Sequence, residues 1–277
     1  MEHLDFENPP LISTLMEVQF QPPPEYNYIH AQNVWALFQP EFPIVGIGPN
    51  SQPMFEEKEI LKPQMAKGDI ITNQPLHPRY LFQHNDFSPE NGGEVLHFEG
   101  YRFARSWQAD RYGQNQTYPH YQNLREKFKD DLQKLQIFFV DLVRFIKPNQ
   151  KDTKLEISHA SISYDNRINL ASLKNKKVSD WFENLKIDEL SYESFLFNFS
   201  RKLNFQNCYV ARGQAKIGNV IMKDDQPGIG FTLAVNANLN DHTIESAMSF
   251  FDQAHDEIID CFNKITTEHA KEIWGAK

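Results

Sequence analysis

The stretch TIESAMSFFDQAHDEIIDCFNKITTEHAKEIW, residues 243–274, decides the fold class of this chain. Residues suited to packing recur every three or four positions, as on one face of an α-helix. They are Ile244, Met248, Phe251, His255, Ile258, Phe262, Ile265, His269 and Ile273. Thr243 can cap this helix, Gly275 can end it, and Thr266–Thr267 predict a bend or a restart. A helix with one long apolar face must pack on something, and the preceding chain supplies strands.

The length, composition and net charge of the chain restrict the classes of function that it can have. With 277 residues, the chain forms one large domain or two small ones. Its net charge of −9 argues against unspecific nucleic-acid binding, which depends on basic residues. The two cysteines, Cys208 and Cys261, form no CxxC pair and predict buried thiols in a reducing compartment. We expect no signal peptide and no membrane span, since no apolar run approaches ~20 residues. A cytoplasmic location follows as an expectation.

The first half of the chain, residues 1–150, contains a series of predicted elements. They are a strand at Leu11–Phe20, a short helix at His30–Phe38, strands at Met54–Leu61, Arg79–His84 and Glu94–Trp107, and a long helix at Pro119–Phe145. The second half, residues 151–277, repeats this order. Its elements are a strand at Leu155–Ile168, a short helix at Val178–Leu185, strands at Ser194–Leu203, Tyr209–Ile217 and Gly230–Leu239, and the closing helix.

These series predict an α+β protein with two similarly ordered halves. In each half a long helix covers one face of an antiparallel sheet. The residue identities of the two halves do not visibly repeat, so only a similar element order is inferred. We expect the halves to pack as one globular unit.

One candidate binding segment lies before the first long helix. It carries Trp107, Arg111, Tyr112 and Tyr118, with Tyr121 following. Such residues stack on bases, pack as a loop edge or anchor a protein interface. The net charge favours a protein partner over nucleic acid.

A second candidate is the end of the strand at Leu155–Ile168. Tyr164, Asn166 and Arg167 follow apolar residues there and are predicted near the rim of the sheet. These side chains either tie down the next loop or touch a ligand or partner.

Motifs for catalysis and cofactor binding give no candidate. His255 and Asp256 resemble a metal-binding pair, but consecutive helical residues point about 100° apart. Gly46-x-Gly48 and Gly228-x-Gly230 have neither the third glycine nor the lysine of phosphate loops. No GxSxG elbow occurs. We therefore predict no catalytic residue, no metal and no cofactor.

Several stretches together resemble one family of bacterial proteins, which is sporadically distributed and carries a placeholder name. They are Asn8–Pro9–Pro10–Leu11 with Glu17–Val18–Gln19–Phe20, Val95–Leu96–His97–Phe98 with Ser106–Trp107, Tyr164–Asp165–Asn166–Arg167–Ile168, and His255–Asp256–Glu257–Ile258 with Phe262, Ile265 and Thr266. Asp165 departs from the family pattern, which has an apolar residue there. The resemblance implies no established catalytic residue. It implies an accessory protein of a phage-defence or toxin-related operon, serving the product of a neighbouring gene.

The leading hypothesis is therefore a non-enzymatic binding or regulatory protein that acts on another protein. One alternative is a small-molecule binder with an apolar pocket between sheet and helices. The other is an enzyme of unrecognised type, which would bring carboxylates and histidines together in one cleft. The sequence leaves homo-oligomerisation open.

Overall fold

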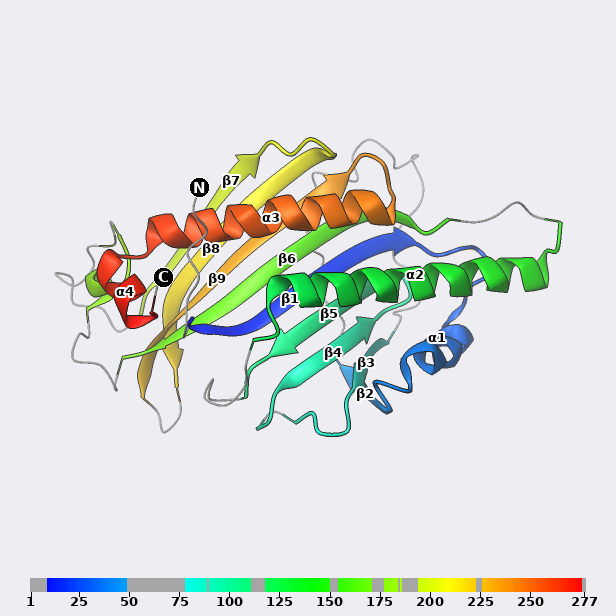
Figure 1. Ribbon diagram of the computed structural model, residues 1–277, viewed down its shortest axis with the longest axis horizontal. Helices are drawn as coiled ribbons and strands as arrows, with labels where there is room; N and C mark the ends of the chain where they lie inside the picture. Colours follow the sequence, from blue (N-terminus) through cyan, green and yellow to red (C-terminus); the bar gives the residue numbers. More distant parts are fainter. Residues whose placement is uncertain are drawn as a thin grey trace.

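The structure is a computed structural model that describes residues 9–48, 78–88, 90–110, 118–149, 154–170, 177–183, 185, 194–222 and 226–275. Its centre is a nine-stranded sheet in the order β2-β3-β4-β5-β1-β6-β9-β8-β7 (Figure 1). Every pair of neighbouring strands is antiparallel. Sheet and helices together confirm the predicted α+β class.

Buried and accessible side chains alternate most clearly along the central strands of the sheet. They are β1 (Leu11–Gln21), β2 (Ile44–Gly48), β3 (Arg79–Gln83), β4 (Gly93–Phe98), β5 (Arg102–Gln108), β6 (Glu156–Asn169), β7 (Leu196–Leu203), β8 (Cys208–Ile221) and β9 (Pro227–Leu239). In the central pair, Met16 of β1 lies opposite Ile162 of β6, and both are buried. Their neighbours Ser161 and Ser163 are only half-buried. This period of two separates an apolar face of the sheet from a polar one.

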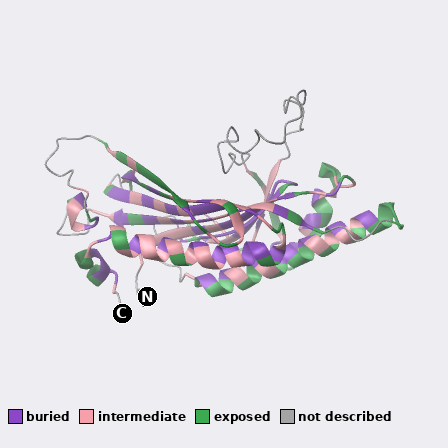
Figure 2. Cartoon of the chain, turned by 90° about the horizontal axis from the view of Figure 1, so that it is seen from above, coloured by how far each residue is buried: buried purple, intermediate pink, exposed green. Residues whose placement is uncertain are grey.

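The helices of the described residues are α1 (Ala31–Phe38), α2 (Tyr121–Ile146), α3 (Ile244–Ile265) and α4 (Glu268–Ile273), with 3₁₀ turns at η1 (Tyr28–His30) and η3 (Val178–Asp180). Figure 2 shows α2 and α3 running along the same side of the sheet. Within the described ranges, no helix is both long enough and apolar enough to cross a membrane.

Aromatic side chains connect the helices to the sheet and to each other. Phe103 of β5 stacks on Phe128 of α2 with ring centroids 5.9 Å apart. Phe128 in turn meets Phe251 of α3 edge-on at 5.7 Å. Farther along α3, Phe262 contacts Phe231 of β9 at 5.8 Å. One continuous core therefore lies beneath both long helices.

The closing helix has the predicted cap and the predicted restart. Thr243 Oγ1 accepts a hydrogen bond from the Ser246 backbone N–H at 3.0 Å. After the break, Thr267 caps α4 by accepting from the backbone N–H of Ala270 at 3.1 Å. The break shifts the helical phase, so Ala270 of α4 and its C-cap residue Trp274 are buried. The predicted stripe is wrong there, because His269 and Ile273 are exposed.

Other differences from the expected elements have local causes. The strand predicted at Glu94–Trp107 is a hairpin of β4 and β5, turned by Gly100 at a φ of 84°. β2 forms despite the breaker residues around it. The short helix predicted at Val178–Leu185 is only the turn η3. The strand predicted at Met54–Leu61 lies outside the described residues.

The burial of α3 gives a stability prediction. Phe251, Ile258 and Phe262 are at most 7% exposed, which confirms that α3 is a core element. Phe262→Ala should lower the free energy of unfolding by about 3–5 kcal/mol, measured by urea denaturation. The control is Ile137→Ala on α2, where the side chain is 60% exposed and the cost should stay within about 0.5 kcal/mol. Equal costs for the two variants would contradict the packing of α3 on the sheet.

Candidate functional site

Trp107, the anchor predicted for the first binding segment, lies near the end of β5 and is 3% exposed. Its indole meets the ring of Tyr118 edge-on, with centroids 5.2 Å apart. Tyr118 is half-buried just before α2. Arg111 and Tyr112 lie outside the described residues. The ends of the segment therefore pack on the protein's own core.

Tyr164 joins this cluster from the centre of the sheet. Its hydroxyl lies 2.7 Å from Nδ1 of His255 on α3. The His255 ring stacks on Tyr121 of α2 at a centroid distance of 3.9 Å. The structure thus brings Trp107, Tyr118 and Tyr164 together, two candidates from the first segment and one from the second.

The electrostatics of this cluster suit packing better than proton transfer. Burial raises the pKa of Tyr118 to about 12. Burial, together with the neighbouring Tyr118 and Tyr121, raises the pKa of Tyr164 well above its usual value. These phenols stay neutral at physiological pH. The cluster ties α2, α3 and β6 together.

Asn166 and Arg167, the remaining candidates, lie on opposite faces of β6. The buried Asn166 amide donates to the backbone oxygens of Phe231 at 3.3 Å and Tyr164 at 3.4 Å. Arg167 is exposed on the other face. Asn166 is thus a structural residue on the helix-covered face, and Arg167 does not join the aromatic cluster.

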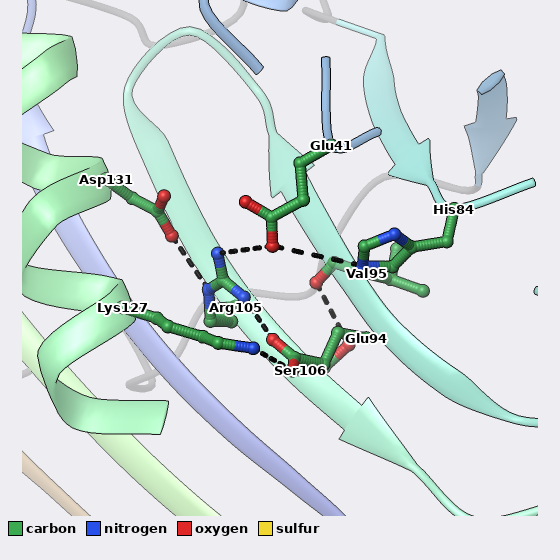
Figure 3. A network of polar contacts seen from close by, with 8 residues as sticks. All are labelled: Glu41, His84, Glu94, Val95, Arg105, Ser106, Lys127 and Asp131. Atoms are coloured by element: carbon green, nitrogen blue, oxygen red, sulfur yellow. Dashed lines mark hydrogen bonds and ion pairs between the residues drawn. The ribbon is translucent and has the colours of Figure 1, made fainter. Parts of the chain in front are cut away.

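A charged network not foreseen from the sequence surrounds Arg105 of β5 (Figure 3). The Arg105 guanidinium donates to Asp131 of α2 at 2.8 Å and to Glu94 of β4. Glu41, in the turn after α1, lies 3.7 Å from the same guanidinium. Lys127 of α2 donates to the second oxygen of Glu94 at 2.6 Å.

These charges compensate each other. Burial opposes the charge on Arg105, but the surrounding carboxylates outweigh it and raise its pKa. Burial raises the pKa of Asp131 against the opposing effect of Arg105. For Glu94, Arg105 and Lys127 together outweigh burial and lower its pKa. Because each charge has partners within the network, we interpret it mainly as a clamp between α2 and the sheet.

A polar cleft of about 290 Å³ opens beside this network. His84, Asp86, Glu94 and Trp107 line it. Across the described ranges, no three His, Cys, Asp or Glu side chains are grouped to hold a metal ion.

The sheet has a second face, directed away from α2 and α3, which we call the open face. Its N-terminal part is not exposed, because Glu17 and Arg102 are buried there and His97 is half-buried. Arg102 Nε lies 2.8 Å from Glu17 Oε1. Burial nevertheless outweighs this attraction and raises the pKa of Glu17 to about 7. Burial also lowers the pKa of His97 to about 3.

The outer strand β7 exposes apolar side chains. In the described part of the chain, β7 pairs with β8 alone, so its other edge carries no ladder. Leu196 is 64% and Phe199 is 50% exposed. Unpaired strand edges with apolar side chains are sites where another chain can add a strand.

An apolar groove runs between β7 and α3. Its volume is about 110 Å³, and its walls include Phe199, Ala215, Ile258 and Cys261. Arg201 of β7 forms an ion pair with Glu257 of α3 at this groove. We call the edge of β7 together with this groove the edge site.

A comparison with protein-family models, curated proteins and solved structures finds no match to this chain. The sequence signal of the edge site was the segment LFNFSRKL, residues 196–203, which is aromatic at one end and basic at the other. The strand itself was predictable, but its place at the edge of the sheet was not.

The Arg105 clamp gives a stability prediction. Arg105→Met should leave Asp131, 2% exposed, without its partner and should cost about 3–5 kcal/mol in unfolding free energy. The control is Arg144→Met, whose ion pair with Asp141 spans 3.9 Å on the surface. Such exposed pairs contribute about 0–1 kcal/mol. Denaturant titration of both variants would refute the clamp if Arg105→Met were as mild as the control.

Glu17 gives a prediction on pH. Its pKa, raised from 4.5 to about 7, means that the folded chain keeps a proton that the unfolded chain releases. Its stabilising contribution is therefore complete below the unfolded pKa and is lost as pH rises through the folded pKa. Glu17→Gln has no such loss. The difference in unfolding free energy, Glu17→Gln minus wild type, should therefore increase by up to ~3 kcal/mol between about pH 4 and pH 8.

Urea denaturation across this range tests the Glu17 prediction. The control, Glu156→Gln, changes an exposed glutamate at the start of β6 and should give a flat difference. A flat difference for Glu17→Gln as well would contradict the raised pKa.

Proposed function

We propose that this chain is a non-enzymatic binding protein that receives an extended segment of another protein at its edge site. The observation that carries the proposal is the outer edge of β7, where half-exposed Phe199 lies beside an apolar groove. An added strand gains main-chain hydrogen bonds from such an edge, while its side chains fill adjacent pockets.

The chemistry of the described side chains supports binding over catalysis. Burial raises the pKa of Cys208 to about 11 and also raises the pKa of Cys261. Thiols with raised pKa values are poor nucleophiles at neutral pH. The tyrosines of the aromatic cluster remain neutral, and the Arg105 network is satisfied internally.

We further propose that the fold consists of two similarly ordered halves. The strand order supports this, because β1 and β6, the first strand of each half, are central neighbours. Outward from them run β5-β4-β3 on one side and β9-β8-β7 on the other. In this arrangement β7 corresponds to β3. In the described part of the chain, β2 lies outside β3, whereas no further strand lies outside β7.

The resemblance to a sporadically distributed bacterial family suggests which gene encodes the partner. We propose that a flanking gene of a phage-defence or toxin-related operon encodes it. An added strand suits such an accessory role, because it engages a short segment and leaves the rest of the partner free.

A peptide-display selection tests the binding function. The library combines random peptides with overlapping fragments of the flanking gene products, and the bait is the full chain. Phe199→Asp should abolish binding of the selected peptides, since it places a charge at the apolar wall of the groove. Ile137→Asp, at a 60% exposed position on α2, is the matched control and should retain binding.

Thermal melting of both variants checks that they fold. The proposal fails if no peptide is enriched, or if the enriched peptides bind the folded Phe199→Asp variant as well as wild type.

A further inference from the structure

We infer that the segment bound at the edge site alternates acidic and apolar side chains. This inference rests on the proposed function and specifies its ligand. In a strand added to β7, successive side chains point to opposite faces of the sheet. One set faces the open face, and the other faces the groove beside α3. The two faces differ sharply in charge and polarity.

The open face is basic beside β7. The pairing register places Lys202 of β7 next to Arg212 of β8, and Asn198 of β7 next to Lys216 of β8. Lys202 and Lys216 are exposed, and neither forms an ion pair with the described residues. The nearest carboxylate along the Lys216 row is Asp165 of β6, two strands farther in.

Among the described residues, Asp165 forms no ion pair with Lys202 or Lys216, and both of its oxygens already accept hydrogen bonds. It accepts hydrogen bonds from Thr232 at 2.6 Å and Ser13 at 3.2 Å. Neighbouring strands lie about 4.8 Å apart, so a strand added to β7 would place side chains within reach of Lys202 and Lys216. Carboxylates at these positions would complement a patch that is positive on a chain of net charge −9.

The groove face favours apolar side chains instead. Arg201, the cation of β7 on this face, already pairs with Glu257. Apolar side chains of the groove wall include Phe199, Ala215, Leu233, Val235 and Ile258, with Cys261 beside them. A charged side chain placed there would lose hydration without gaining a partner, whereas an apolar one would bury surface favourably. Acidic residues toward one face and apolar residues toward the other give the alternation.

Two other occupants fit the site less well. Single-stranded nucleic acid uses aromatic side chains for base stacking. The open face between the cations instead carries Ser200, Gln214 and Ala234. A second copy of this chain would bring a second set of the same cations to the seam, where like charges repel.

The test uses two synthetic octapeptides and the full chain. One peptide alternates Asp with Val, and the other alternates Lys with Val. Fluorescence anisotropy should detect binding of the Asp–Val peptide only. The double variant Lys202→Glu/Lys216→Glu should weaken this binding roughly tenfold or more, because two attractions become repulsions. The matched control, Lys129→Glu/Lys154→Glu, makes the same charge change on α2 and before β6 and should bind as wild type does.

Two further measurements locate the peptide. Methylating alternate backbone nitrogens gives two complementary Asp–Val peptides, and only the one methylated on its β7-facing amides should lose binding. Bound peptide should also protect Cys261, in the groove wall, from alkylation. Cys208, which does not line the groove, should react unchanged and serves as the internal control.

The inference is overturned if the Asp–Val peptide does not bind, or if the charge-reversed double variant binds it equally well. Binding of single-stranded DNA that is lost in this variant would assign the face to nucleic acid. A dimer in solution that dissociates on Phe199→Asp would assign the edge to a second copy. Selected peptides that depend on Phe199 but lack acidic residues would leave the proposed function standing and remove only this inference.

Discussion

The pairing of β1 with β6 is the contact on which the rest of the structure depends. These strands lie at the centre of the sheet, with Val18 opposite Ala160 and Met16 opposite Ile162. Because their register is fixed, the apolar side chains of both strands reach the same face, and a slip by one residue would turn them outward. α2 and α3 then share one core beneath them. Burying that face leaves β2 and β7 as the outer strands of the described sheet.

Local chemistry in the sequence was sufficient to predict most of the elements. The 3.6-residue period of α3 and its Thr243 cap are properties of neighbouring residues, so they could be read directly. The Thr266–Thr267 break was also visible, but its effect on helical phase was not, and His269 was therefore placed on the wrong face. The hairpin of β4 and β5 was missed because a single glycine, Gly100, turns the chain.

The candidate site was harder to predict because it depends on long-range contacts. Trp107 and Tyr118 were recognised as residues able to anchor a partner, but the structure places their rings against each other at 5.2 Å. Nothing local distinguishes an anchor that binds a partner from one that binds its own core. Arg105 and Asp131 are 26 positions apart, and their pairing needs the packing of α2 on β5. The edge position of β7 likewise depends on strand order, which pattern alone does not determine.

The distribution of charge connects the fold to the edge site. The excess of acidic residues gives the chain −9 overall, yet Lys202, Arg212 and Lys216 gather on one face of β7 and β8. Lysine at a strand edge also disfavours pairing with strands of other chains. The backbone N–H and C=O groups of the edge nevertheless stay available for pairing. An acidic segment is the class of partner that these cations attract instead of repel. The same residues would then disfavour pairing with other chains and select one kind of strand at an exposed edge beside an apolar groove.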